Sequence, residues 1–386
     1  MKLIVNTSNL YVGGGLQVAL SFINELKSLE NSHEYYIFLS LAVEKQLDKD
    51  SFSDKFHFYR IDKSPASLKT RKEVIERLDR LENSIKPDIV FSVFGPTYWT
   101  PKTKHIMGFA VPWVLQQDSV AYKELSFFKR IKMRLWVAYI AYYAKQNASD
   151  YVIETEDGKN RLSNVLDIGK EHIFVVGNSY SSIFNDENLL EEKNENYIKL
   201  PTKSEEEFRL LLISHNYPHK NLKIIKQILA FLNEINVKFI LTIDEKNYHE
   251  LFQELDSDKI INLGPVKQKS CPSLYKQCDA MFLPTLLEVF SASYPEAMKM
   301  KKPILTSNYS FAKDVCKDAA LYFDPLDPED IAKKIKQLIE DKSLQNELIE
   351  KGTKRLQEFE TAHTRAEKYI EICETILNKT QGEKNV

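Results

Sequence analysis

Short, apolar, β-rich runs alternate with longer helical patterns along almost the whole sequence. Such alternation is typical of parallel sheets whose strands are joined by crossover helices. In the first half, the strand candidates are 3–6, 35–39, 56–59, 89–92, 106–109, 151–153 and 173–176. A second series consists of 209–213, 238–243, 260–263, 280–283, 303–306 and 321–323. We therefore predict an α/β protein with two separate doubly wound sheets.

A polar, acidic stretch separates the two series of strands. Residues 185–207 are rich in Asn and Glu, which predicts an interdomain connection. The chain has 386 residues, more than one hydrophobic core normally serves. We predict domains at 1–184 and 208–360, joined by this connection, with a C-terminal helix and polar tail at 361–386.

Composition excludes several classes of protein. Hydrophobic residues at 43% and charged residues at 28% are ordinary for a soluble globular protein, and a net charge of −2 does not favour a nucleic-acid partner. Four irregularly spaced cysteines predict neither a disulfide framework nor a zinc site. We expect a cytoplasmic protein, because the sequence shows no signal peptide and no run of apolar residues long enough to span a membrane.

Two carboxylates stand where an apolar strand gives way to a helix. Strand 280–283 breaks at Pro284 and a helix begins near Ser293, which leaves Glu288 in the loop and places Glu296 in the first helical turn. Both side chains can then face one crevice at the carboxyl end of the sheet, where open α/β sheets bind ligands. The helix N-terminus between them suits a phosphate. This arrangement indicates a polyhydroxylated ligand that carries phosphate.

The same residues also allow a purely structural interpretation. Residues 293–296 form a fair capping box, with Ser293 as N-cap and Glu296 reaching back to it, and Pro295 is tolerated in a first turn. Spacing alone leaves both interpretations open.

The segment around the two carboxylates resembles the E-x7-E signature of retaining glycosyltransferases of family 4. Glu288 and Glu296 match its two acids and Phe290 its third position, whereas the usual glycines are Val289 and Ser291 here, and the usual proline comes two residues late. The resemblance implies a GT-B fold, in which two Rossmann-like domains face a central cleft. The first domain would bind the acceptor and the second domain the nucleotide sugar. The C-terminal helix would return to pack against the first domain.

Residues 214–221, after strand 209–213, extend the resemblance. Lys220 matches the family lysine that contacts the donor diphosphate. His215 occupies the position at which the family usually has an arginine. Because histidine is only partly charged near neutral pH, Lys220 would carry most of the leaving-group charge. Alternatively, Lys220 caps a loop and His215 is an ordinary polar residue. We reject a metal pair of His215 and His219, since Pro218 opposes a regular helix there and no carboxylate is near in sequence.

Further donor contacts follow from the same resemblance. Gly264 and Val266 resemble the loop that flanks the nucleotide base, where Gly264 permits close backbone approach and Val266 offers its main chain; in isolation, Gly264-Pro265 would merely mark a turn. The remaining candidates for donor binding are Phe290, Ser291, Ala292 and Ser293.

A glycine-rich turn follows the first strand. Gly13, Gly14 and Gly15 precede a helix, but Val18 breaks the Gly-x-Gly-x-x-Gly pattern, so a dinucleotide fingerprint is not supported. The resemblance places this loop near the acceptor and the donor phosphates, and a plain tight turn is the alternative. His105 begins a strand rather than ending one, so we assign it no catalytic role.

Residues 121–150 hold six basic residues against two acidic ones, interleaved with aromatic residues at helical spacing. This pattern is typical of a membrane-surface helix, which would suit a lipid-linked acceptor. It is equally typical of a crossover helix that packs its apolar stripe on the sheet and exposes its lysines. We favour the packed helix and keep weak peripheral contact with the inner membrane surface as the alternative.

The resemblance implies a retaining glycosyltransferase that moves a hexose from a nucleoside diphosphate sugar to a glycan or lipid-linked acceptor, in bacterial surface polysaccharide assembly. Lys220 and the amides near Ser291 to Ser293 would stabilise the departing diphosphate, with no metal or other cofactor. Glu296 would bind the ribose and Glu288 the sugar hydroxyls, neither needing a shifted pKa.

Two other classes of protein remain open. A nucleotide-sugar 2-epimerase shares the two-domain layout, and a non-catalytic sugar-binding protein with two α/β lobes would also bind a saccharide. The sequence identifies neither the base, the sugar, the acceptor, the linkage nor the oligomeric state.

Overall fold

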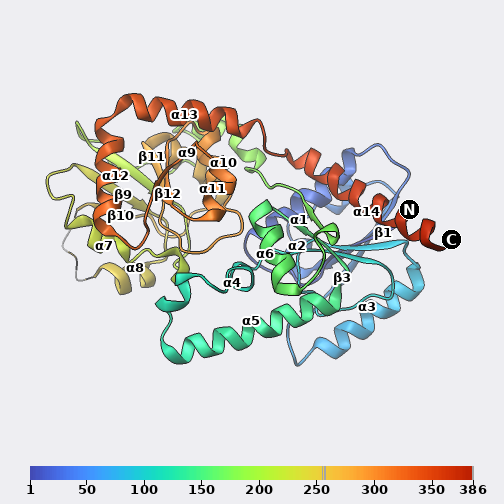
Figure 1. The fold of residues 1–386 in the computed structure, drawn as a ribbon. Helices are drawn as coiled ribbons and strands as arrows, with labels where there is room; N and C mark the ends of the chain where they lie inside the picture. The colour runs from blue at the N-terminus through green and yellow to red at the C-terminus, as the bar shows by residue number, and fades with distance from the viewer. Residues whose placement is uncertain (254, 256–257, 385–386) are drawn as a thin grey trace. The chain divides into compact units, whose positions relative to one another are not determined.

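The chain folds around two parallel sheets in a computed structural model that describes residues 1–253, 255 and 258–384 (Figure 1). It divides into two compact units. The first unit comprises Met1–Gln116, Ile131–Asn178 and Glu360–Val386, and the second comprises Gln117–Arg130 and Ser179–Phe359.

The sheet of the first unit has seven strands in the order β3-β2-β1-β4-β5-β6-β7, and every pairing is parallel. Its strands are β1 (Lys2–Thr7), β2 (Glu34–Ser40), β3 (Phe56–Ile61), β4 (Ile89–Ser92), β5 (His105–Gly108), β6 (Asp150–Ile153) and β7 (Ile173–Val175). The helices are α1 (Gly14–Glu25), α2 (Leu41–Glu44), α3 (Arg71–Ile85), α4 (Pro112–Leu115), α5 (Phe127–Asn147), α6 (Glu156–Leu166) and α14 (Ala362–Lys384). The first four residues of α5 group with the second unit.

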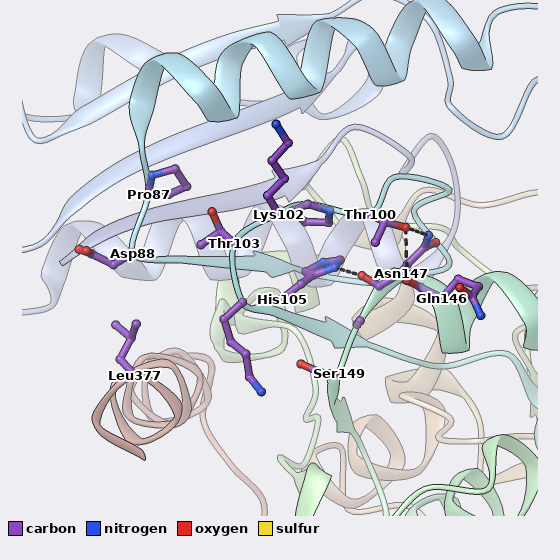
Figure 2. A pocket seen from close by; sticks show the side chains of 13 residues that line it. Pro87, Asp88, Thr100, Lys102, Thr103, His105, Gln146, Asn147, Ser149 and Leu377 are labelled. Carbon is purple, nitrogen blue, oxygen red and sulfur yellow. Dashed lines mark hydrogen bonds between the residues drawn. The ribbon is translucent and has the colours of Figure 1, made fainter. Parts of the chain in front are cut away.

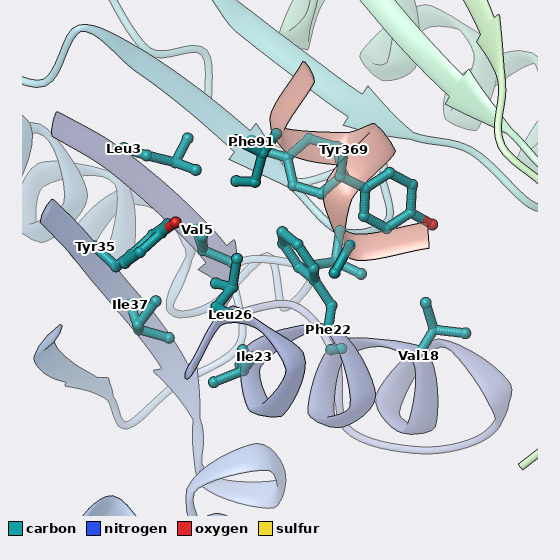
Figure 3. Packing of buried hydrophobic residues seen from close by; sticks show 14 of the residues in the cluster. Leu3, Val5, Val18, Phe22, Ile23, Leu26, Tyr35, Ile37, Phe91 and Tyr369 are labelled. Carbon is teal, nitrogen blue, oxygen red and sulfur yellow. The ribbon is translucent and has the colours of Figure 1, made fainter. Parts of the chain in front are cut away.

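The core of the first unit contains residues from both the N-terminal and the C-terminal parts of the chain. Phe22 of α1 packs edge-on against Tyr369 of α14, with ring centroids 5.1 Å apart, and against Phe91 of β4 (Figure 3). At the rim, Arg365 donates hydrogen bonds to Asn178 and to the Ser21 hydroxyl. These contacts explain why the C-terminal helix belongs to the first unit.

The sheet of the second unit has six parallel strands in the order β10-β9-β8-β11-β12-β13. They are β8 (Phe208–Leu212), β9 (Val237–Leu241), β10 (Ile260–Asn262), β11 (Ala280–Leu283), β12 (Ile304–Ser307) and β13 (Leu321–Phe323). The helices are α7 (Ile224–Leu229), α8 (Glu245–Phe252), α9 (Cys271–Gln277), α10 (Ser293–Lys299), α11 (Ser310–Cys316), α12 (Pro328–Glu340) and α13 (Lys342–Leu356). The strand order reverses at β8, which lies between β9 and β11.

Single 3-10 turns fill several connections. They are η1 (Leu26–Ser28), η2 (Lys49–Ser51), η3 (Val120–Glu124), η4 (Lys170–His172), η5 (Ser182–Asn185), η6 (Glu187–Leu190), η7 (Pro218–Lys220) and η8 (Gln268–Ser270). η5 precedes the polar connection and ends at its first residue, and η6 lies within it. The connection belongs to the second unit, where the Leu200 amide donates a hydrogen bond of 2.9 Å to Gln277.

Every strand predicted from the sequence is present within two residues of its predicted bounds, so the prediction of two doubly wound sheets is confirmed. The two units differ from the sequence-derived domains at several places. Residues 179–184 and the predicted connection 185–207 belong to the second unit, and Glu360 belongs to the first. Residues 117–130, which lie within the predicted domain 1–184, also belong to the second unit. The reason is tertiary contact, since Ser119 donates a hydrogen bond of 3.0 Å to the Leu286 carbonyl and Glu124 forms an ion pair with Lys223.

Candidate functional site

Lys220 and Glu288 meet in the second unit. Lys220 ends η7, whereas Glu288 lies in the loop after β11. Two hydrogen bonds hold this loop to η7, because the Leu286 amide and the Thr285 hydroxyl both donate to the His219 carbonyl, at 2.7 and 3.2 Å. The Lys220 ammonium group donates to the Glu288 carboxylate, and the two side chains are only 15% and 11% exposed. Shielding from water strengthens the attraction between the two charges.

This ion pair lies at the switch point of the second sheet. η7 belongs to the connection that leaves β8, and Glu288 belongs to the one that leaves β11, the neighbouring parallel strand. The carboxyl ends of both strands therefore share one edge, at the place where the strand order reverses. Open α/β sheets bind their ligands at such points.

Glu296 lies in α10 and is buried, with 8% of the residue exposed. The Tyr275 hydroxyl lies 3.4 Å from its Oε2 and 3.3 Å from the Ser293 carbonyl oxygen. Burial raises the pKa of Glu296 to about 7, and the hydrogen bond from Tyr275 opposes this rise. The proposed ribose contact needs no shifted pKa, and the raised value follows from the removal of the carboxyl group from water.

The capping box is not formed. α10 has Ala292 rather than Ser293 at its N-cap, and no side chain caps it. The Glu296 side chain instead contacts Tyr275 of α9, so its position is not explained by helix capping. Sequence reasoning did not select Tyr275. A buried tyrosine whose hydroxyl needs a partner is the signal that could have identified it.

The start of α10 offers fewer amides than the sequence suggested. This helix has only seven residues. The Tyr294 amide already donates to the Ser291 carbonyl at 3.1 Å, and Pro295 has no N–H. The side chain of Phe290, just before the helix, packs edge-on against Phe359 with ring centroids 6.2 Å apart and offers no hydrogen-bond donor. Lys220 is therefore the stronger feature for binding an anion here.

The two histidines of the η7 loop differ in burial. His215 is exposed, and its carbonyl accepts hydrogen bonds from the Ser214 hydroxyl and the Tyr217 amide, at 2.9 and 3.0 Å. His219 stacks on Tyr217 with ring centroids 5.7 Å apart, and burial together with the nearby Lys220 charge lowers its pKa to about 3. His219 is thus neutral at pH 7. In the described residues, no three His, Cys, Asp or Glu side chains group as a metal site.

Gly264 and Val266 lie in the loop after β10. Gly264 has a φ of +71°, a conformation that favours glycine, and a Cβ there would meet no atom within 4 Å. Val266 is half-buried and packs beside the cluster that contains Tyr275 and Tyr294. The loop thus combines an open backbone position with an anchor close to the α9 and α10 side chains.

The glycine-rich turn belongs to the first unit. Gly13 has a φ of +77° and is the N-cap of α1, and a Cβ on Gly13 or Gly14 would meet open space. Gly15 is different, since a Cβ there would lie 3.2 Å from the Phe94 side chain. The turn therefore needs glycine for its backbone conformation at Gly13 and leaves the main chain of Gly13 and Gly14 accessible.

A cavity of about 750 Å³ in the first unit does not contain any of these residues (Figure 2). It is lined by residues that precede β4, β5 and β6, such as Asp88, Lys104 and Ser149, so it lies at the amino ends of these strands. His105 lines it, but its ring bonds to the Asn147 carbonyl and, at 2.7 Å, to Ser92, and burial lowers its pKa to about 4. The cavity is at the edge opposite to that used by ligands of doubly wound sheets.

Two Rossmann-like parallel sheets with flanking helices define the GT-B fold of glycosyltransferases. Residues 193–355 match the family model described as "Glycosyl transferases group 1". This match covers most of the second unit, including the four candidate side chains His215, Lys220, Glu288 and Glu296. A comparison with the sequences of curated proteins finds no match.

Solved structures share this fold over nearly the whole chain. A glycosyltransferase from Rickettsia africae is 16% identical, with a TM-score of 0.70, and 97% of this chain and 98% of that one are covered. Anabaena Alr3699/HepE in complex with UDP and glucose is 15% identical, with a TM-score of 0.67 and coverage of 97% and 100%. WaaG, a glycosyltransferase involved in lipopolysaccharide biosynthesis, is 12% identical, with a TM-score of 0.68 and coverage of 96% and 99%.

Proposed function

We propose that this protein is a retaining glycosyltransferase that transfers a hexose from a nucleoside diphosphate sugar to a glycan or lipid-linked acceptor. The observation that carries the proposal is the Lys220–Glu288 pair at the switch point of the second sheet. The match of residues 193–355 to a glycosyltransferase family supports it, as do GT-B neighbours with bound UDP or UDP-glucose.

Lys220 and Glu288 would bind different parts of the donor. The Lys220 ammonium group would bind the diphosphate, whose negative charge grows as the bond from the anomeric carbon to its oxygen breaks. The acceptor hydroxyl oxygen forms the new bond to that carbon, and its proton leaves with the diphosphate. Glu288 would accept hydrogen bonds from the sugar hydroxyls. Groups placed in advance around developing charge are an effective source of catalysis.

Glu296 would bind the nucleotide ribose. A carboxylate can accept two hydrogen bonds from a vicinal diol, whereas a protonated carboxyl group must donate its own hydrogen. With a pKa raised to about 7, Glu296 is present in both forms at neutral pH. Donor binding would therefore select the ionised form. Gly264 and Val266 would lie beside the base, and Ser291 to Ser293 beside the phosphates.

A thermal-shift screen with UDP, GDP and ADP tests donor binding first, since a ligand that binds only the folded state raises apparent stability. Matching nucleotide sugars are then incubated with and without oligosaccharide or lipid-linked acceptors, and nucleoside diphosphate release is measured. We expect release that depends on the acceptor. Conversion of the donor alone into its 2-epimer would instead identify an epimerase, and binding without any turnover a sugar-binding protein.

The pathway proposed is the assembly of a bacterial surface polysaccharide. WaaG, which shares the fold, is described as acting in lipopolysaccharide biosynthesis. A screen of acceptors drawn from such glycans tests this assignment, and activity restricted to a free monosaccharide would contradict it.

A further inference from the structure

Helix α5 carries apolar side chains on two opposite faces. Val137, Ile140 and Ala144 are buried in the first unit, so the helix packs there as expected for a crossover helix. On the other side, Phe128 is 82% exposed and Leu135 is 68% exposed. The packed-helix interpretation therefore accounts for only one of the two apolar faces.

The exposed apolar residues form one continuous stripe. With a rotation of about 100° per residue, they fall within roughly 100° of the helix circumference, about opposite the buried face. The members of this stripe are Phe127, Phe128, Ile131, Leu135 and Tyr142, each at least 45% exposed. The stripe follows a single helix of 21 residues, about 30 Å long. Such a long, exposed apolar surface is typical of an interaction site.

Basic residues border the stripe on both sides. By the same rotation, Arg134 and Lys145 fall along one border and Lys132 along the other, and all three are exposed. Lys129 and Arg130 add two further charges, and residues 127–147 contain no Asp or Glu. The positive charge is therefore not neutralised within the helix.

We propose that this stripe and its basic borders, together the α5 face, bind the surface of an anionic lipid bilayer. The helix axis lies parallel to the membrane, with the aromatic and aliphatic side chains at the boundary of headgroups and acyl chains and the basic side chains on lipid phosphates. A second copy of the chain is a poor occupant, because two such faces carry the same charge. An anionic bilayer matches both the apolar stripe and its borders.

This proposal does not depend on the proposed function. None of Lys220, Glu288 and Glu296 belongs to the α5 face. None of the helices among the described residues has the length and hydropathy of a membrane span.

Vesicle flotation of the full chain tests the proposal. We expect the protein to bind vesicles of equal parts phosphatidylcholine and phosphatidylglycerol, and to bind pure phosphatidylcholine much more weakly. Added salt should weaken binding to the anionic vesicles because it screens charge. Absence of binding to anionic vesicles, or equal binding to both compositions, would overturn the proposal.

Paired variants separate the apolar and basic contributions. Phe128→Ser and Leu135→Ser should each lower the partition coefficient on the order of tenfold, since both side chains enter the interface. Phe231→Ser removes a side chain that is 42% exposed in the second unit and should change nothing. Lys132→Glu and Arg134→Glu should each lower binding by at least about fivefold, whereas Lys354→Glu, on exposed α13, should not.

The oligomeric state of the protein without lipid is compared between the wild type and a double variant. Light scattering should show the same mass for the wild type and the Phe128→Ser, Leu135→Ser double variant. A dimer in the wild type that the double variant abolishes would show that the α5 face pairs two copies of the chain, and the membrane assignment would be withdrawn.

Discussion

The ammonium group of Lys220 donates a hydrogen bond to the carboxylate of Glu288, a residue 68 positions later in the chain. Each charge is thereby held in place by the other, and both side chains are largely shielded from solvent. A donor diphosphate that binds Lys220 competes with Glu288 for its hydrogens, which leaves the carboxylate oxygens available to the sugar hydroxyls. The two residues are therefore expected to act as one unit.

Removal of either partner should abolish most turnover. We expect Lys220→Ala and Glu288→Ala each to lower kcat/KM on the order of a hundredfold, because each variant loses a group placed in advance of the reaction. The double variant should lose little more than the worse single variant, as residues that act together are not additive. Lys333→Ala, on the exposed surface of α12, is the matched control. Losses that multiply in the double variant would show independent roles.

Burial of Glu296 should make stability depend on pH. Its pKa is raised from 4.5 to about 7, so the folded state holds the proton more tightly than the unfolded state. The resulting contribution to stability is fully present below pH 4.5 and is lost as the pH rises through 7. Relative to Glu296→Gln, the free energy of unfolding of the wild type should fall by about 3 kcal/mol across this range. Urea unfolding at several pH values measures it, with Glu340→Gln at an exposed carboxyl as control. Parallel pH curves for the wild type and Glu296→Gln would contradict the assignment.

Donor affinity should depend on the same ionisation. If the Glu296 carboxylate binds the ribose, affinity for the nucleoside diphosphate sugar should weaken by up to about tenfold for each pH unit below 7. Calorimetry in buffers of different ionisation enthalpy should detect a released proton. Glu296→Gln should bind weakly and without this pH dependence. Equal affinity at pH 5.5 and 7.5 in the wild type would exclude a role for the carboxylate.

Tyr275 should act as a positioning residue for Glu296. Its hydroxyl lowers the Glu296 pKa, so Tyr275→Phe should raise that pKa further. We expect weaker donor binding at pH 7 and recovery above pH 8, where the carboxyl group ionises in both proteins. Titrating donor affinity against pH distinguishes this shift from a general packing defect, which would lower affinity equally at every pH.

The strands could be predicted because each apolar run carries its own signal. β8 and β11, for example, are short buried runs that begin directly after an acidic residue, Glu207 or Asp279, and parallel pairing then brings the residues that follow them to one edge. The family resemblance of the two loops implies that Lys220 and Glu288 contact one donor, and the two side chains form an ion pair. The elevated pKa of Glu296 was not expected, because it depends on how α9 packs against α10. The basic and aromatic residues of α5 are visible in the sequence, but which of its apolar residues are buried depends on tertiary contacts.

A second buried ion pair should stabilise the second unit without any part in the proposed chemistry. Arg209 at the start of β8 donates to Glu207 at 2.5 Å and to the Pro201 carbonyl at 2.6 Å, and both charged side chains are less than a tenth exposed. Glu207→Ala leaves the guanidinium group buried without its countercharge, which should cost about 3 kcal/mol of unfolding free energy. The neighbouring pair of Lys203 and Asp279 is more exposed, at 40% and 27%.

Lys203→Ala is therefore the matched comparison for Glu207→Ala. Because solvent screens an exposed pair, its loss should cost less than about 1 kcal/mol. Urea unfolding of both variants measures the difference, and donor affinity should stay unchanged in each, since neither pair touches Lys220, Glu288 or Glu296. Equal costs for the two variants would mean that burial does not set the strength of these pairs. A further double variant, Glu207→Leu with Arg209→Met, should be more stable than Glu207→Ala alone, because it removes the unpaired charge and keeps the apolar volume.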